Sequence, residues 1–270
     1  MNHQAVQEHI VNWLSNYVKK TGVKGFVVGV SGGIDSAVTS TLCALTRCKT
    51  VLVEMPIHQP LDQVSRGKEH IDYLTQKFEN CSSLVLDLTS TYDLFLTELS
   101  SKSDIEKSEE VKNLTLGNTR ARLRMTSLYA VAGIEGLLVA GTGNKVEDFG
   151  VGFFTKYGDG GVDISPIADL FKTQVYDLAK HLGVNQNILS APPTDGLWDD
   201  GRTDEDQIGA TYAELESAML LQERHGNSIP ESVFETERMK EVWAIYFGRW
   251  KANQHKMNPI PVCEIPPELK

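Results

Sequence analysis

Apolar residues recur along this chain with two periods, one typical of helices and one typical of short buried strands. An N-terminal helix that ends near Gly22 is predicted by apolar residues at every fourth position, Val6, Ile10, Leu14 and Val18. Short apolar runs then predict five strands, at Gly25–Val30, Thr50–Met55, Ser83–Leu88, Leu137–Ala140 and Ile164–Ala168.

Segments with a helical pattern lie between and after these runs. The first group is Ala37–Leu45, Asp62–Phe78, Tyr92–Leu99, Ile105–Leu114 and a helix that begins at an Asn118 cap and extends to Ala132. The second group is Lys172–Leu182, Thr211–Leu221 and Glu231–Asn253, followed by an extended tail, Pro259–Pro267. Strands that alternate with helices predict an α/β fold, a doubly wound and mostly parallel five-stranded sheet with helices on both faces. In such sheets ligands bind beyond the carboxyl ends of the strands.

Composition narrows the class of protein. The 270 residues can form one substantial core, and we expect a single domain over residues 1–270. A net charge of −10 argues against a broad nucleic-acid surface. The chain has neither a membrane-length apolar stretch nor the pattern of a signal peptide, so we expect a cytoplasmic protein with no nucleic-acid or membrane partner. The cysteines form no CxxC pair and the histidines no HExxH pattern, so a zinc site has little support.

The segment Gly29–Ser36 carries the strongest chemical signal. Its sequence, GVSGGIDS, lies between a predicted strand and a predicted helix, an arrangement that directs free backbone N–H groups toward a phosphate. The frame is that of a Walker A loop, but Asp35 stands where that motif has lysine. A carboxylate repels phosphate unless a metal ion lies between them, so the loop predicts a magnesium–pyrophosphate site. An ordinary glycine turn is the alternative, which the full SGGxDS pattern disfavours.

A second polar segment, Gly141–Asp163, follows the fourth predicted strand and contains seven glycines. Within it Glu147 offers another carboxylate for magnesium, because hard oxygen ligands suit that ion; a solvated loop glutamate is the alternative. The run Phe153–Tyr157, FFTKY, places aromatic rings beside a lysine that can contact a phosphate or carboxylate. A buried aromatic pair with a surface lysine explains this run equally well.

Three further features are weaker signals. Arg120, Arg122 and Arg124 are two residues apart on a predicted helix, so they cannot all face one ligand. The stretch Ser190–Asp206 is a long loop that contains Trp198, and such loops are usually functional or disordered. An aromatic stripe near the C-terminus is expected in the core or at a subunit contact; it consists of Trp243, Tyr246 and Trp250.

Together these residues match a known family. SGGIDS, GTGNKVE, GFFTKYGDGGVDISP, PPTDGL and the terminal HK occur in the order and approximate spacing of ammonia-dependent NAD synthetases. The chain resembles that family over nearly its whole length. SGGxDS alone is shared by the wider group of N-type ATP pyrophosphatases, whereas FFTKYGDGG is much more specific to NAD synthetases. The resemblance implies a Rossmann-like fold of the adenine nucleotide alpha hydrolase type.

The resemblance also implies an activity. In this family the nicotinate carboxylate of deamido-NAD attacks the α-phosphate of ATP, giving an adenylate and pyrophosphate, and ammonia then displaces AMP to leave NAD. Mg²⁺ and the loop N–H groups suit this chemistry because they stabilise charge on the departing pyrophosphate. Glutamine-dependent relatives carry an additional glutaminase domain ahead of the synthetase, and here the glycine loop begins by residue 29, so we expect no such domain and expect free ammonia, or ammonia from a separate partner, as the nitrogen donor. Family members are homodimers with substrate sites at the subunit boundary, and the loop around Pro192–Asp206 resembles their mobile segment.

Site residues follow from the resemblance position by position. The positions that match ATP-binding ones are Gly29, Val30, Ser31, Gly32, Gly33, Ile34, Asp35, Ser36, Thr142, Lys172 and Thr194. Those that match deamido-NAD-binding ones are Arg122, Lys156, Asp163, His255 and Lys256. Asp35 and Glu147 are expected to bind magnesium. Asp159 is the candidate catalytic residue that holds or deprotonates ammonium.

The sequence departs from the family pattern in two places, and two other functions compete with NAD synthesis. Many bacterial relatives have a GTDHA-type sequence where this chain has GTGNK. Between Glu147 and Phe153 this chain is one residue longer than many of those relatives. Glu54 stands where many relatives have a basic residue near the adenine nucleotide, so no ATP contact is assigned to it. A tRNA-thiolating pyrophosphatase is disfavoured by the missing CxxC pair and the acidic charge. A nucleotide-binding sensor without turnover is disfavoured by the intact charged residues Asp35, Glu147, Lys156 and Lys172.

Overall fold

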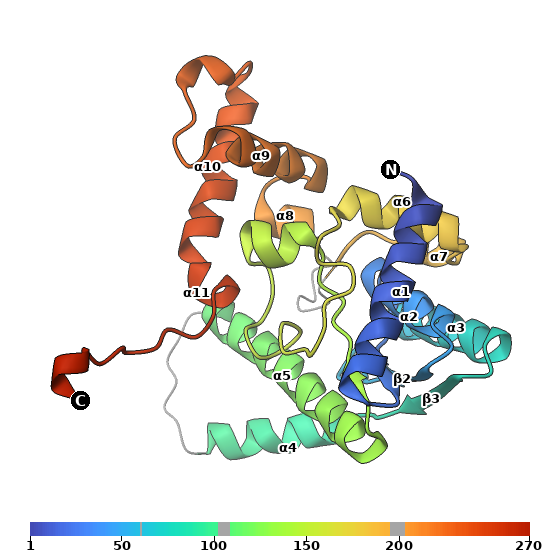
Figure 1. The fold of residues 1–270 in the computed structure, drawn as a ribbon. Helices are drawn as coiled ribbons and strands as arrows, with labels where there is room; N and C mark the ends of the chain where they lie inside the picture. The colour runs from blue at the N-terminus through green and yellow to red at the C-terminus, as the bar shows by residue number, and fades with distance from the viewer. Residues whose placement is uncertain (60, 102–108, 195–202) are drawn as a thin grey trace.

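The fold contains a parallel sheet whose strands lie in the order β3-β2-β1-β4. Figure 1 labels two of these strands, β2 and β3, near α2 and α3. The computed structural model describes residues 1–59, 61–101, 109–194 and 203–270. The strands are β1 (Gly25–Gly29), β2 (Lys49–Glu54), β3 (Cys81–Val85) and β4 (Leu138–Val139), and all neighbouring pairs are parallel. The predicted α/β class and parallel sheet are therefore confirmed.

The predicted number of strands is wrong, since within the described ranges the sheet has four strands and not five. Of the expected fifth strand, Ile164–Ala168, only Ile164 pairs, in an isolated parallel bridge with Ala140. The following backbone groups bond locally: Leu170 N–H donates to the carbonyl of Ile167 at 3.0 Å. Ile167 is fully buried, so the run is apolar because it packs in the core and not because it extends the sheet.

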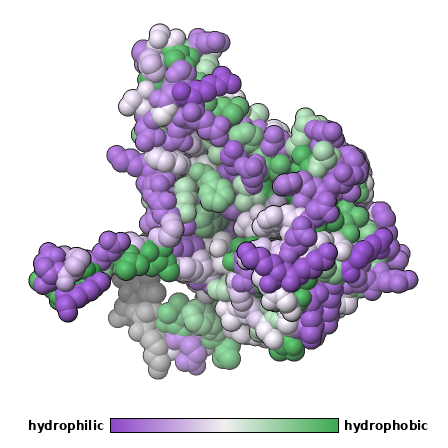
Figure 2. Space-filling view, viewed as in Figure 1, coloured by the Kyte–Doolittle hydropathy of each residue, from purple (hydrophilic) through white to green (hydrophobic). Residues whose placement is uncertain are grey.

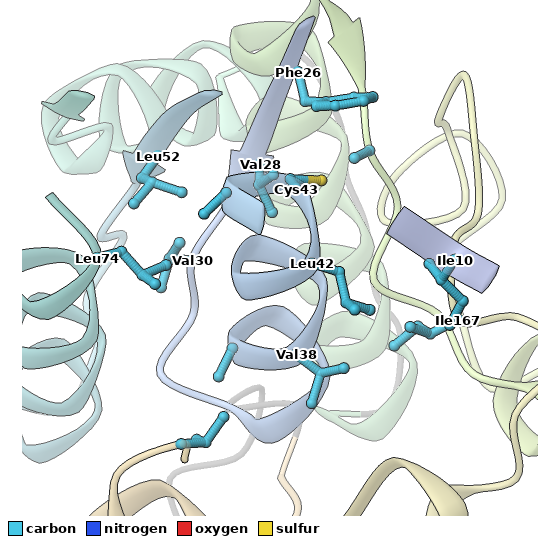
Figure 3. Packing of buried hydrophobic residues seen from close by; sticks show 14 of the residues in the cluster. Ile10, Phe26, Val28, Val30, Val38, Leu42, Cys43, Leu52, Leu74 and Ile167 are labelled. Carbon is cyan, nitrogen blue, oxygen red and sulfur yellow. The ribbon is translucent and has the colours of Figure 1, made fainter. Parts of the chain in front are cut away.

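One face of the sheet is covered by α1 (His3–Thr21), α2 (Ile34–Leu45), α3 (Leu61–Lys77), α6 (Lys172–Leu182) and α7 (Gln186–Leu189). The predicted N-terminal stripe faces this core: Leu14 is fully buried, and α1 ends where Gly22 adopts φ +74°. Val28, Leu42 and Leu74 from β1, α2 and α3 lie in the same cluster (Figure 3). This packing fixes the amino end of α2, which begins in the glycine loop.

The opposite face is covered by α5 (Glu109–Glu135), and α4 (Thr89–Ser100) precedes α5 in the chain. Val27 and Val53 of the sheet pack with Ala132 of α5. The predicted cap at Asn118 is wrong, because α5 runs through it without a break and its Oδ1 accepts a 2.6 Å hydrogen bond from Thr155 Oγ1. Of the predicted helix Ile105–Leu114, residues 105–108 lie outside the described residues and the remainder belongs to α5.

The C-terminal part packs as a second cluster above the sheet's carboxyl edge. It contains a π-helical turn, η1 (Val146–Val151), and the helical segments α8 (Asp204–Ile208), α9 (Tyr212–His225), η2 (Glu231–Val233), α10 (Glu237–Ala252) and α11 (Gln254–Met257), whereas η3 (Pro267–Leu269) lies in the tail. Tyr246 is fully buried in this cluster, so the aromatic stripe belongs at least in part to the core. The single helix predicted over Glu231–Asn253 is wrong at its start, because Thr236 caps α10 through its side chain.

The tail leaves the body after α11 and runs away from it as an extended arm, as predicted (Figure 1). Among the described residues, no helix combines the length and the apolar character that crossing a bilayer requires.

Candidate active site

A cavity of about 830 Å³ opens at the carboxyl edge of the sheet. The ends of three strands reach it through Gly29, Glu54 and Ala140, and α5 and α6 add further walls. All eight residues of the glycine loop line it, together with Thr142, Glu147, Asp159, Lys172, Thr194 and Lys256. The structure therefore brings most of the predicted site residues to one cavity.

The glycine loop is held by a network of short-range hydrogen bonds. Ser36 Oγ donates to the carbonyl of Gly33 at 2.9 Å and accepts from Ser31 N–H at 3.3 Å. Gly32 has φ +83°, and a Cβ there would lie 2.5 Å from the carbonyl oxygen of Gln63 on α3. Only glycine meets both demands, and the result is a loop whose N–H groups lie at the amino end of α2.

Asp35, Glu147 and Lys172 form a buried ionic triad at the floor of the cavity. Lys172 Nζ lies 2.6 Å from Asp35 Oδ2 and 2.9 Å from Glu147 Oε1. The three residues come from α2, η1 and α6, and the Lys172 side chain is only 4% exposed. The two carboxylates that the sequence analysis assigned to magnesium thus converge on one point.

Two residues that the sequence analysis missed orient this triad. Asn144 is fully buried; its Nδ2 donates to Asp35 Oδ1 at 3.1 Å, and its Oδ1 accepts from Glu147 N–H at 3.2 Å. Tyr212, the first residue of α9, donates from its hydroxyl to Glu147 Oε1 at 2.7 Å. Asn144 lies inside the GTGNK run and so carried a local signal. Tyr212 lies 65 residues beyond Glu147, and no local pattern marks it.

Burial and neighbouring charges shift the ionisation of the triad. Burial raises the pKa of Asp35, an effect that the Lys172 ammonium opposes and the Glu147 carboxylate reinforces. Burial also acts to raise the pKa of Glu147, but Lys172 and the Tyr212 hydroxyl bring that pKa below its ordinary value. Burial acts to lower the pKa of Lys172, but the two carboxylates raise it above its usual range. At neutral pH the ammonium therefore stays charged between its partners.

The residues at this point fit a magnesium ion. Mg²⁺ is commonly held by one or two carboxylates, with waters and substrate phosphates completing its shell. Asp35 and Glu147 supply that number, next to a loop that offers N–H groups to phosphate. Within the described ranges no group of three or more His, Cys, Asp or Glu side chains could hold a metal ion. The site is therefore suited to a cation that arrives with a phosphate, and not to one caged by protein alone.

Two more carboxylates lie farther along the cavity. Asp159 Oδ1 accepts a 2.9 Å hydrogen bond from Thr155 N–H, and burial raises its pKa. Asp148 also lines the cavity, and burial together with the charges of Glu147 and Asp159 raises its pKa to about 8. Its carboxylate occupies the space beside Gly143, where a Cβ would lie 2.1 Å from Asp148 Oδ2.

The residues expected to bind deamido-NAD are more scattered. Lys256 lines the cavity, and its Nζ donates to the carbonyls of Gly152 and Phe154 at 2.8 and 2.9 Å. Arg122 Nε donates to the Lys156 carbonyl at 3.3 Å, and Lys156 Nζ donates to the carbonyl of His255. These three residues lie near Lys256 but are not among the described residues that line the cavity.

Asp163 forms hydrogen bonds with other parts of the fold. Its Oδ2 accepts a 2.8 Å hydrogen bond from Val139 N–H in β4, and its Oδ1 accepts a 3.0 Å bond from the Tyr129 hydroxyl. Asp163 is likewise absent from the cavity lining within the described ranges. Of the predicted loop Ser190–Asp206, residues 195–202, which include Trp198, lie outside the described residues, and Thr194 near its start borders the cavity.

Comparison with known proteins identifies the arrangement. The model of the NAD synthase family matches residues 6–260. The chain belongs to the NAD synthase family. It is 38% identical over 274 residues to the NH(3)-dependent NAD(+) synthetase of Syntrophomonas wolfei, a match that covers 100% of both chains.

Solved structures agree with this assignment. The chain is similar to the NMN synthetase of Francisella tularensis, with a TM-score of 0.82 and 31% identity over 98% of this chain and 100% of that one. It is also similar to the NH3-dependent NAD synthetase of Campylobacter jejuni, with a TM-score of 0.75 and 25% identity over 98% of this chain and 100% of that one.

Proposed function

We propose that this protein is an ATP-dependent ligase that amidates deamido-NAD with ammonia, through an adenylate, to give NAD, AMP and pyrophosphate. The observation that carries the proposal is the buried triad of Asp35, Glu147 and Lys172 directly beside the glycine loop. Relatives that the chain matches along their full length are named for ammonia and NAD, which supports the same reaction. The single synthetase domain without a glutaminase and the cytoplasmic location stay predictions from the sequence.

In the first half-reaction the nicotinate carboxylate attacks the α-phosphate of ATP and pyrophosphate leaves. The glycine-loop N–H groups and the hydroxyls of Ser31 and Ser36 bind the phosphates, and Thr142 and Thr194 border the nucleotide. Asp35 and Glu147 would hold Mg²⁺, which when bound would supply positive charge to stabilise the departing pyrophosphate. Lys172 provides a second positive charge beside the pyrophosphate once the carboxylates of Asp35 and Glu147 no longer neutralise its ammonium group.

In the second half-reaction the nitrogen of ammonia forms a bond to the acyl carbon and AMP departs. Ammonium has no unshared pair, so a base must first remove a proton. We assign this role to Asp159, whose raised pKa suits a proton acceptor that works near neutral pH. Lys256 at the cavity wall, with Arg122, Lys156, His255 and Asp163 around it, is assigned to deamido-NAD.

The decisive experiment measures conversion of deamido-NAD to NAD with ATP and Mg²⁺, with ammonium compared with glutamine. We expect turnover with ammonium only. Asp35→Asn keeps the shape of the side chain but removes its charge, and we expect it to abolish adenylate formation, measured as pyrophosphate release. Asp177→Asn, at an exposed site on α6, is the control. Wild-type protein that releases no pyrophosphate with deamido-NAD would refute the function.

A second candidate function is amidation of the mononucleotide. The observation that favours it is the similarity to the Francisella tularensis NMN synthetase. The same two half-reactions on nicotinate mononucleotide would give NMN, and the glycine loop and triad would serve both substrates. Comparison of kcat/KM for nicotinate mononucleotide and for deamido-NAD decides between them, because only the dinucleotide carries an adenosine half to bind.

We also propose that the protein acts as a homodimer. Apolar side chains are exposed on α4 and α5, with Leu94 65%, Phe95 50% and Leu114 51% accessible. Figure 2 shows hydrophobic residues gathered over α4 at the bottom of the view. A patch of this kind is typical of a surface that another protein covers. Light scattering after size exclusion tests the proposal, and Phe95→Glu is expected to shift the mass from dimer to monomer.

A further inference from the structure

Glu54 has a side chain that the reaction described above does not use. It is the last residue of β2, next to the glycine loop, because Val30 N–H donates to the Val53 carbonyl at 2.9 Å. Its own carbonyl accepts from Leu86 N–H at 2.8 Å, so its backbone is fully engaged. The residue is only 7% exposed, and it lines the cavity.

The Glu54 carboxylate has no hydrogen-bond partner among the residues that the structure describes. Its Oε1 is buried, and the nearby Lys68 forms its ion pair with Asp72 at 2.6 Å instead. Burial raises the pKa of Glu54 as a result. A buried carboxyl group without a donor destabilises the protein, and a ligand that donates a hydrogen bond to it removes that cost.

The chemistry of ATP limits which part of it can meet Glu54, and this step rests on the proposed binding of ATP at the glycine loop. Phosphates carry no donor and repel a carboxylate, so the nucleoside must lie here. Met55, the next residue after Glu54, and Val64 also line the cavity and add apolar surface, which suits a flat base better than a ribose. The donor that adenine offers at its edge is the 6-amino group.

We propose that Glu54 is a specificity residue that accepts a hydrogen bond from the 6-amino group of the adenine base of ATP. This replaces the sequence-based interpretation, which assigned no ATP contact to this position. It also gives a reason for a carboxylate at a site where many relatives carry a basic residue: the buried group is paired only when nucleotide is bound.

The test measures equilibrium binding, with Mg²⁺ but without deamido-NAD, of ATP and of purine riboside triphosphate, which lacks the 6-amino group. Hydrogen bonds to charged groups change affinity by about tenfold to a hundredfold, so the wild type is expected to prefer ATP by that ratio. Glu54→Met removes the acceptor at nearly constant length, and its ratio is expected to fall close to one. Glu79→Met, at an exposed site after α3, is the matched control and keeps the wild-type ratio.

Thermal unfolding without ligand provides a second readout. Glu54→Met is expected to unfold at the same temperature as the wild type or a higher one, whereas a purely structural glutamate would lower it. Equal affinity of the wild type for both nucleotides, or an unchanged preference in Glu54→Met, overturns the proposal. A preference that appears only against 2′-deoxy-ATP places the contact on the ribose and also overturns it. Discrimination without turnover of deamido-NAD would refute the proposed function and leave this inference standing.

Discussion

Lys172→Met tests whether a buried ammonium holds together the two carboxylates that we propose to bind magnesium. The substitution keeps the length and apolar stem of the side chain but leaves Asp35 and Glu147 as two buried like charges. The ammonium lies 2.6 and 2.9 Å from these groups, whose side chains are 17% and 16% exposed. Removal of one partner from a buried ion pair costs about 3–5 kcal/mol, because the remaining charge is left uncompensated.

This magnitude is large enough to measure by thermal unfolding. For a chain of about this size 1 kcal/mol corresponds to roughly 2–4 °C in Tm, so a decrease of about 6–20 °C is expected at pH 7. Lys180→Met is the matched control on the same helix, because Lys180 is 64% exposed and its loss should change stability by less than about 0.5 kcal/mol.

Two further conditions separate electrostatics from packing. In Lys172→Met the two carboxylates repel each other and therefore bind protons more tightly in the folded state than in the unfolded state. The loss of stability relative to the wild type should therefore grow as pH rises from about 4 to 7. Mg²⁺ binds the folded variant and should restore part of its stability. The triad does not work as described if the free energies of unfolding of Lys172→Met and Lys180→Met differ by less than about 1 kcal/mol at pH 7 and Mg²⁺ does not change the stability of Lys172→Met.

Three other substitutions probe neighbouring features. Tyr212→Phe removes the 2.7 Å hydrogen bond to Glu147 and should raise the Mg²⁺ concentration for half-maximal activity about tenfold with a smaller change in kcat, measured by magnesium titration. Gly143→Ala places a Cβ 2.1 Å from Asp148 Oδ2 and should cost about 1–3 kcal/mol in urea unfolding. Burial lowers the pKa of His70 from 6.5 to about 4. The free energy of unfolding of the wild type should therefore fall by about 3 kcal/mol as the pH is lowered from 6.5 to 4, and that of His70→Gln should change less over the same range.

The elements that were predicted correctly are those whose own side chains determine them. The stripe that includes Leu14 gave α1, and the apolar run at Phe26 gave β1, because burial of one face or of a whole strand leaves a local pattern. Ile164–Ala168 has the same apolar character but only one residue of pairing. Burial alone therefore does not distinguish a strand from a turn that packs into the core.

Polar residues inside helices were the harder case. Asparagine is a preferred residue at helix caps, and this local preference predicted a cap at Asn118. In α5 the Asn118 side chain instead accepts a hydrogen bond from Thr155, which no local rule predicts. The same limit applies to the site. Asp35 stood out because its motif has a fixed spacing, whereas Tyr212 reaches Glu147 only through the packing of α9 on η1. Tertiary contacts, and not local preference, decide such residues.

That packing links the proposed magnesium site to the C-terminal helices. Glu147 lies in η1, and η1 ends at Gly152, which has φ +63° and whose Cβ, if present, would lie 2.4 Å from that of Asn253. Asn253 follows α10, and its Nδ2 donates to the Val151 carbonyl at 2.8 Å. A π-helical turn held this tightly from α9 and α10 fixes the direction of one carboxylate, while the glycine loop fixes the other. The ligand geometry at the phosphate site therefore depends on the C-terminal cluster as much as on the sheet.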